Sequence, residues 1–230
     1  METLEFHGLT VTLERKAIRR LYLRVLPPDG RVQISAPLQM PQTEILNFLE
    51  QKESWVRRQK EKFPEQPPAP LEYLPGEKIS LWGTEYPLQI VPGKSCHAEQ
   101  VGTVIRITAP ENSTAAQRQV AVEDLYRREL HRMIPDLLAE REYQIGVRCK
   151  EWHVKKMRTK WGTCNVQCAR IWLSLYLAEY SVECLDYVIT HELVHLLEVH
   201  HNARFYELMD RFEPEWPQIR AHLNGKRAYL

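Results

Sequence analysis

Two histidines and a glutamate stand together in one short stretch of the chain, His191-Glu192-Leu193-Val194-His195. Residues four apart on an α-helix lie one turn above each other, so both imidazoles would project to one side and share one zinc ion. Glu192 is rotated by about 100° from His191, so its carboxylate would reach a zinc-bound water and not the metal. The pattern predicts a hydrolytic zinc site with His191 and His195 as ligands and Glu192 as the base.

The residues around this motif are typical of a buried helix. Ser181 is a candidate N-cap, and Glu183 and Asp186 complement the helix dipole in the first turn. Two histidines and a glutamate that face a core are costly unless a metal or polar partners satisfy them, which disfavours a chance occurrence on a surface helix. The apolar positions of the stretch are Leu185, Val188, Ile189, Leu193, Val194, Leu196 and Leu197.

A catalytic zinc needs a third protein ligand and one open position. On a continuous helix His201 would lie about 9 Å further along the axis than His195, too far to share the ion. A reversal of the chain near Val199–His200, for which Asn202 is suited, would bring His201 back to the site. We therefore expect His201 as the third ligand. The other polar candidates are Glu198, His200, Glu207 and Glu213.

The elements that must position this site follow from hydrophobic periodicity. Alternating patterns predict strands at 9–13, 21–25, 31–36, 78–82, 86–91, 104–108, 152–157 and 170–174, and residues 152–157 and 170–174 are expected to flank a hairpin loop. Helical patterns occur at 41–62, 113–145, 204–212 and 216–223. Thr114 is a candidate N-cap, and Pro135 is expected to kink or end the long helix. Its apolar stripe would be Val120, Leu125, Leu130, Ile134, Leu137 and Leu138.

The order of these elements predicts an α+β protein with two regions. Residues 1–110 would form a β-rich N-terminal region containing the helix at 41–62, and residues 111–230 the catalytic domain. A proline-rich stretch at 64–70 indicates a stiff connection. Residues 79–110 also loosely echo 10–37, since each reads as strand hairpins closed by Ala-Pro and followed by a helix.

Composition narrows the class of protein. A net charge of +1 gives no global field for nucleic acid or acidic membranes, and no run of about 20 apolar residues exists to span a bilayer. The start of the chain lacks the pattern of a signal peptide. Five cysteines, an odd number without framework spacing, are typical of a reducing compartment. These features predict a soluble cytoplasmic protein without a membrane partner.

The last third of the chain resembles the YgjP-like zinc metallopeptidases, relatives of the SprT and Wss1-type (WLM) proteins. The matching positions are Trp161-Gly162-Thr163-Cys164, Tyr187-Val188, the motif from His191 to His195, and His201 with Phe205-Tyr206. Thr163 and Tyr206 stand where the family has Ser and Trp. The N-terminal strands and the helix ending in ESWVRRQ also look like the family's leader region. The resemblance implies His201 as the third ligand and a zincin-like core, with an active-site helix on a small antiparallel or mixed sheet.

Several residues near the motif could bind substrate. The resemblance places the loop around Trp161 beside the cleft, where Arg158, Lys160 and Trp161 could hold a carboxylate or phosphate. The strand 170–174 with Trp172 could be the sheet edge to which an extended substrate adds. The structural alternatives are a hairpin whose Trp161 covers the core and an ordinary core strand. Cysteines 149, 164, 168 and 184 lack paired zinc spacing and are expected to be buried thiols.

The sequence leaves the substrate open. The leading interpretation is peptide hydrolysis with one Zn²⁺, although histidine ligands also accept other divalent metals. The alternatives are a hydrolase of nucleotide phosphoanhydride bonds and a binding module that keeps the zinc fold. Relatives of the SprT and Wss1 type act on DNA-bound proteins, and the basic hairpin at 155–160 is compatible with nucleic acid. Oligomeric state is not predicted.

Overall fold

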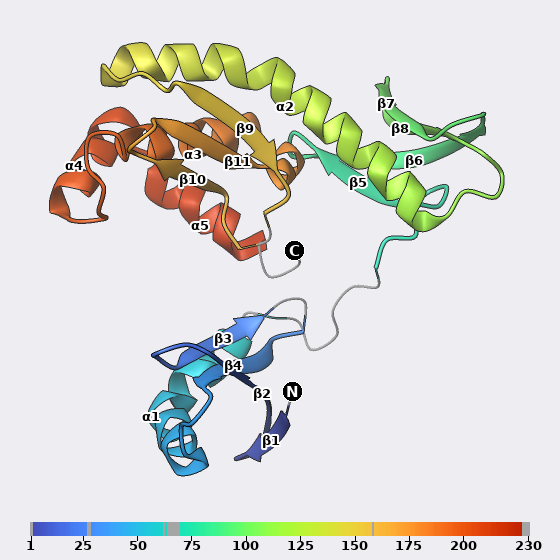
Figure 1. Cartoon of the computed structure of the whole chain (residues 1–230). Helices are drawn as coiled ribbons and strands as arrows, with labels where there is room; N and C mark the ends of the chain where they lie inside the picture. Colours follow the sequence, from blue (N-terminus) through green and yellow to red (C-terminus); the bar gives the residue numbers. More distant parts are fainter. Residues whose placement is uncertain (1, 27–28, 62, 64–69, 158, 227–230) are drawn as a thin grey trace. The chain divides into compact units, whose positions relative to one another are not determined.

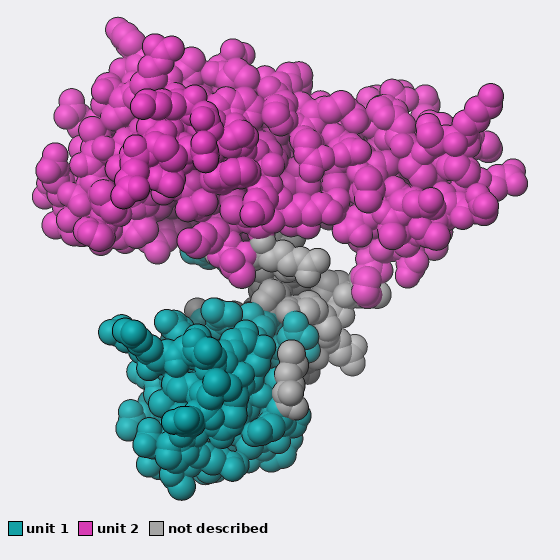
Figure 2. All heavy atoms as spheres, in the orientation of Figure 1, with its two compact units in different colours: residues 1–69, 224–230 teal, residues 70–223 magenta. Residues whose placement is uncertain are grey.

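A computed structural model describes residues 2–26, 29–61, 63, 70–157 and 159–226, without the side chain of residue 226. The chain forms two compact units, residues 1–69 with 224–230 and residues 70–223 (Figure 2). Both units combine helices with small sheets (Figure 1), which confirms the predicted α+β class. The strands within residues 78–109 were expected to belong to the N-terminal region. In the structure they share a hydrophobic core with the helices of the second unit.

The first unit is a sheet covered by one helix. Its strands are β1 (Glu2–Phe6), β2 (Leu9–Lys16), β3 (Tyr22–Leu26) and β4 (Arg31–Pro37), in the order β1-β2-β4-β3. The alternating apolar residues of β2 and β4 face α1 (Gln42–Lys60), which buries Ile45, Leu49 and Val56. The predicted strands and helix are confirmed. β1 was not predicted, because its only buried residue is Phe6.

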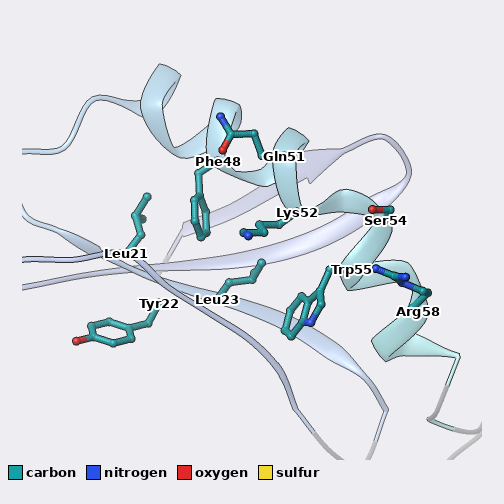
Figure 3. Close-up of a pocket in the computed structure, with 9 residues that line it drawn as sticks. All are labelled: Leu21, Tyr22, Leu23, Phe48, Gln51, Lys52, Ser54, Trp55 and Arg58. Atoms are coloured by element: carbon teal, nitrogen blue, oxygen red, sulfur yellow. The ribbon is translucent and has the colours of Figure 1, made fainter.

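An open groove lies between α1 and the edge strand β3 of this unit (Figure 3). The rings of Phe48 and Trp55 extend from the helix toward the strand. These residues therefore form a surface feature of the first unit, whereas the histidine motif belongs to the second unit.

The second unit begins with a sheet that repeats the first one. Its strands are β5 (Lys78–Leu81), β6 (Thr84–Pro92), β7 (His97–Val101) and β8 (Val104–Ala109), in the order β5-β6-β8-β7. In both sheets a hairpin pairs the first two strands, the second strand runs parallel to the fourth, and the third is antiparallel to the fourth. The echo between 10–37 and 79–110 thus extends to strand order and direction.

A long helix, α2 (Ala115–Ile145), runs across the second unit (Figure 1). Thr114 caps it as predicted, in a capping box with Gln117. Pro135 lies inside the helix and does not end it. The predicted stripe is wrong at Val120, whose side chain is 54% exposed because the buried face passes through Ala121 and Val122.

A three-stranded sheet of β9 (Glu151–Lys155), β10 (Gly162–Asn165) and β11 (Arg170–Ser174) completes the scaffold of the site. Two predictions about it were wrong. The hairpin partner of β11 is β10, which lies within the expected loop, while β9 and β11 are parallel. The order β10-β11-β9 also makes β11 the central strand, so the strand at 170–174 has no free edge for an added substrate strand.

Four short helices follow this sheet: η1 (Leu175–Glu179), α3 (Val182–Val194), α4 (Ala203–Phe212) and α5 (Trp216–Lys226). α3 packs against α2 on one side and against β10 and β11 on another, and its interior residues are buried. An active-site helix on a small mixed sheet, as predicted, is therefore the centre of this unit. None of the described helices is both long enough and apolar enough to cross a membrane.

Candidate metal centre

The histidine motif lies at the end of α3, where the chain reverses. α3 ends at Val194 with His195 as its C-cap, about one turn earlier than the sequence suggested. Asn202 then caps α4 by accepting a hydrogen bond from the backbone N–H of Phe205. The chain therefore reverses between α3 and α4. Such a reversal was expected to be needed for His201 to approach the motif.

The reversal brings three imidazoles together. The ligand atoms of His191, His195 and His201 lie within 4.8 Å of one another, and the Nε2 atoms of His191 and His201 are 3.0 Å apart. Among the described residues, no other three His, Cys, Asp or Glu side chains form such a group. Of the rejected candidates, His200 is exposed and Glu213 is bound to Arg141.

The three imidazole rings pack against one buried aromatic side chain. Phe205 is fully buried, and its ring centroid lies 5.0 Å from that of His191, 4.8 Å from that of His195 and 4.6 Å from that of His201. The Nδ1 atom of His195 is 3.1 Å from the carbonyl oxygen of Glu198. If Nδ1 donates to this carbonyl, Nε2 is left free to bind a metal, which is the usual arrangement of histidine ligands.

Burial keeps these imidazoles neutral. Burial, followed by the neighbouring His195 and His201, lowers the pKa of His191 to about 3. Burial is also the largest cause of the lowered pKa of His195 and of His201. Neutral imidazole is the form that ligates a metal, so the group suits a divalent cation at neutral pH.

Glu192 lies against the strand β10. Its side chain is buried, and Oε2 has no hydrogen-bond partner among the described residues. Burial raises its pKa to about 8, which the positive charge of Lys160 partly opposes. Burial and the charge of Glu192 raise the pKa of Cys164 to about 12, so this thiol stays protonated. A buried carboxyl group with a pKa near neutrality is suited to transfer protons.

A partly buried ion-pair network fixes the helices that carry the site. Arg141 of α2 makes two hydrogen bonds to Asp186 of α3, the longer one 2.8 Å from Nε to Oδ1. The same guanidinium binds Glu213, at the end of α4, at 2.7 Å, and donates to the carbonyl oxygen of Phe212 at 2.8 Å. The side chain of Arg141 is 15% exposed. Arg141 therefore links α3 and the end of α4 to α2.

The predicted substrate-binding residues have different positions. Lys160 is exposed and lies near enough to Glu192 to affect the pKa of its carboxyl group. The ring of Trp161 meets that of Tyr180 edge-on at 4.9 Å and packs on the core, as the structural alternative held. Arg158 lies outside the described residues.

Trp172 is not brought to the histidines. Paired residues of an antiparallel sheet share a face, and Gly162, which faces Glu192, pairs with Leu173. Trp172 therefore lies on the opposite face of the sheet, where its ring packs on His153 at 4.5 Å. The Nζ atom of Lys155 is 5.8 Å from the same ring.

Sequence reasoning missed two groups at this centre, Tyr187 and Arg220. Tyr187 lies one turn before His191 on α3, with ring centroids 5.9 Å apart. Arg220 of α5 is exposed, and its positive charge adds to the effect of burial in lowering the pKa of His191 and of His201. Burial raises the pKa of Tyr187 to about 12, and the charge of Arg220 partly opposes this rise. The i, i+4 spacing could have indicated Tyr187. No local signal links Arg220, 19 positions after His201, to the motif.

A buried carboxyl group beside three clustered imidazoles is compatible with a metal-dependent hydrolase. Residues 19–226 match the YgjP-like family, described as "YgjP-like, metallopeptidase domain", and the chain belongs to this family. It is therefore an enzyme of the metallopeptidase class, whose chemistry uses a divalent metal. No curated protein matches the chain.

Two solved structures are similar over part of the chain. They are the metallopeptidase zymogens of Pyrococcus abyssi abylysin and Methanocaldococcus jannaschii jannalysin. The identities are 19% and 22%, each match covers 40% of this chain, and the shares of the other chains are 93% and 95%. The TM-scores are 0.38 and 0.37. Similarity at this level supports no conclusion about the fold or the function of this chain.

Proposed function

We propose that this enzyme is a zinc peptidase in which His191, His195 and His201 hold one Zn²⁺ and Glu192 transfers the protons. The observation that carries the proposal is the cluster of three ligand atoms within 4.8 Å, directly beside a buried carboxyl group. Three neutral imidazoles fit the donor set of catalytic zinc, which keeps its remaining position open. The same donors also accept cobalt, nickel or iron.

A bound Zn²⁺ supplies Lewis acidity, which polarises a carbonyl group and makes water a nucleophile near neutral pH. Glu192 accepts the proton of the attacking water and then donates it to the leaving amine. Its unpartnered Oε2 and its raised pKa support this role, because the carboxyl group takes up and releases a proton near neutral pH. The ring of Phe205 contacts all three imidazoles and so restricts their positions.

The family supports a peptide as substrate. A second candidate is a nucleotide phosphoanhydride, and the exposed Lys160 beside Glu192 favours it, since a free cation there would hold a phosphate. Lys160 forms no ion pair with the described carboxylates. Both reactions would use Glu192, whereas a pure binding module would not need it.

One experiment distinguishes the peptidase, the nucleotide hydrolase and the binding module. Purified protein is incubated separately with an unfolded polypeptide and with nucleoside triphosphates, as wild type and as Glu192→Gln. We expect wild type to release peptides and the variant to lose this activity by at least about 100-fold. Glu183→Gln, an exposed glutamate on the same helix, is the matched control and should keep the activity. Pyrophosphate release without peptide cleavage would overturn the peptidase, and an active Glu192→Gln would overturn catalysis through this site.

A further inference from the structure

A stack of rings leads from the histidine cluster to a free arginine. The rings of His201 and Tyr206 are 6.4 Å apart at 28°, and those of Tyr206 and Trp216 are 5.3 Å apart at 25°. The guanidinium of Arg220 lies 5.8 Å from the centre of the Trp216 ring. A cation over an indole face is held in place while its N–H donors remain available, so the stack presents Arg220 as a binding group.

The stack is itself fixed to the fold. Trp216 donates from Nε1 to the Oδ1 of Asp210 at 2.7 Å, which sets the orientation of the indole. This hydrogen bond also engages the carboxylate of Asp210. Two acidic residues lie between α4 and α5, Glu213 and Glu215. Glu213 is bound to Arg141. Arg220 forms no ion pair with any carboxylate in the part of the chain that the structure describes.

The positive charge of Arg220 acts on residues of the histidine cluster. It reaches Tyr187, His191 and His201, whereas the charge of Lys160 reaches Glu192. Both exposed cations therefore act on the centre, each on different groups. A substrate bound near His201 would therefore lie within reach of the positive charge of Arg220.

We propose that Arg220 binds a carboxylate of the peptide substrate, beside the rings of His201, Tyr206 and Trp216. The proposal rests on the peptidase function proposed above. A guanidinium pairs with a planar carboxylate through two parallel hydrogen bonds, which gives geometric selection as well as affinity. The carboxylate is either an Asp or Glu side chain at a fixed position from the cut bond or the C-terminus of the peptide. The experiment below distinguishes these two sources.

The test maps cleavage sites in a peptide library made by digesting a bacterial proteome. Wild type, Arg220→Gln and Arg220→Lys are compared by mass spectrometry, and the digest is repeated after amidation of the peptide C-termini. We expect wild type to prefer Asp or Glu at one position, or cuts at a fixed distance from a free C-terminus. Arg220→Gln should lower kcat/KM for carboxylate-bearing peptides about tenfold or more relative to their neutral analogues. Arg220→Lys, which keeps the charge, should be intermediate.

The control is Arg211→Gln. Arg211 is another exposed arginine over an aromatic ring, 5.2 Å from the centre of Phe212, and its charge does not enter the pKa of the clustered histidines. It should leave the preference unchanged. Metal content and melting temperature of each variant show whether the fold is intact.

Three outcomes would overturn the proposal. They are cleavage without any carboxylate preference, an unchanged preference in Arg220→Gln, and a rise in KM for nucleoside triphosphates in that variant without an effect on carboxylate peptides. If wild type cleaves no peptide at all, the peptidase function itself fails, and this result is distinct from cleavage without selectivity.

Discussion

Gly162 faces the side chain of Glu192 so closely that any side chain at position 162 would have to displace it. A Cβ atom built on Gly162 would lie 2.5 Å from Oε1, 2.8 Å from Cγ and 2.9 Å from Cδ of Glu192. Real Cβ atoms do not approach other atoms to such distances. The backbone of β10 therefore forms one wall of the space that holds the carboxyl group, which explains a glycine in the Trp161-Gly162-Thr163-Cys164 motif.

We predict that Gly162→Ala lowers activity by about 100-fold, because a displacement of the base of the order of 1 Å costs a large part of the rate. Metal content should stay at the wild-type level, since the histidines are not displaced. The control is Gly225→Ala, where the added Cβ meets nothing within 4 Å. Full activity in Gly162→Ala would mean that the position of the Glu192 carboxyl group does not limit the reaction.

The metal site gives a second prediction. His201→Ala should lose bound metal, because one of the three clustered ligand atoms is removed. His200→Ala should retain it, since this neighbouring side chain is exposed and does not belong to the cluster. Metal analysis of both variants beside wild type is the measurement. Loss of metal in the His200 variant alone would show that the third ligand is wrong.

The local parts of this site could be predicted from the sequence. His191, Glu192 and His195 are neighbours on one helical turn, and their relation follows from helix geometry alone. His201 required one further step, a chain reversal, and the sequence marked it through Asn202. The reversal begins earlier than expected because α3 ends at Val194.

The parts that depend on sheet pairing could not be predicted. Alternation showed that 170–174 is a strand, and gave no information on its partners, so β11 was mistaken for an edge strand. The face on which Trp172 lies follows from the register of Gly162 with Leu173, which no local pattern encodes. The contact between Gly162 and Glu192 joins residues 30 positions apart and depends on the same register.

The Arg141 ion pair gives a third prediction. Arg141 is partly buried, and its removal leaves the carboxylates of Asp186 and Glu213 without this partner. Arg141→Ala should therefore lower the free energy of unfolding by about 1–3 kcal/mol. Arg127→Ala on the same helix is the control. Its partner Asp124 and Arg127 itself are 53% and 42% exposed, and the change should cost less than about 1 kcal/mol. Urea unfolding measures both. Equal effects in the two variants would contradict the anchoring role of Arg141.

A fourth prediction concerns the stability of the fold against pH. Burial raises the pKa of Glu179, at the end of η1, to about 7. The folded chain then holds a proton that the unfolded chain releases near pH 4.5, so stability falls as pH rises from about 4.5 to 7 and is level above that. Glu179→Gln removes this dependence. Its gain in unfolding free energy over wild type should be larger at pH 8 than at pH 5, by on the order of 1–3 kcal/mol. Urea unfolding at the two pH values measures the difference. Glu85→Gln, at an exposed position, should show no such change, and an equal effect of Glu179→Gln at both pH values would contradict the raised pKa.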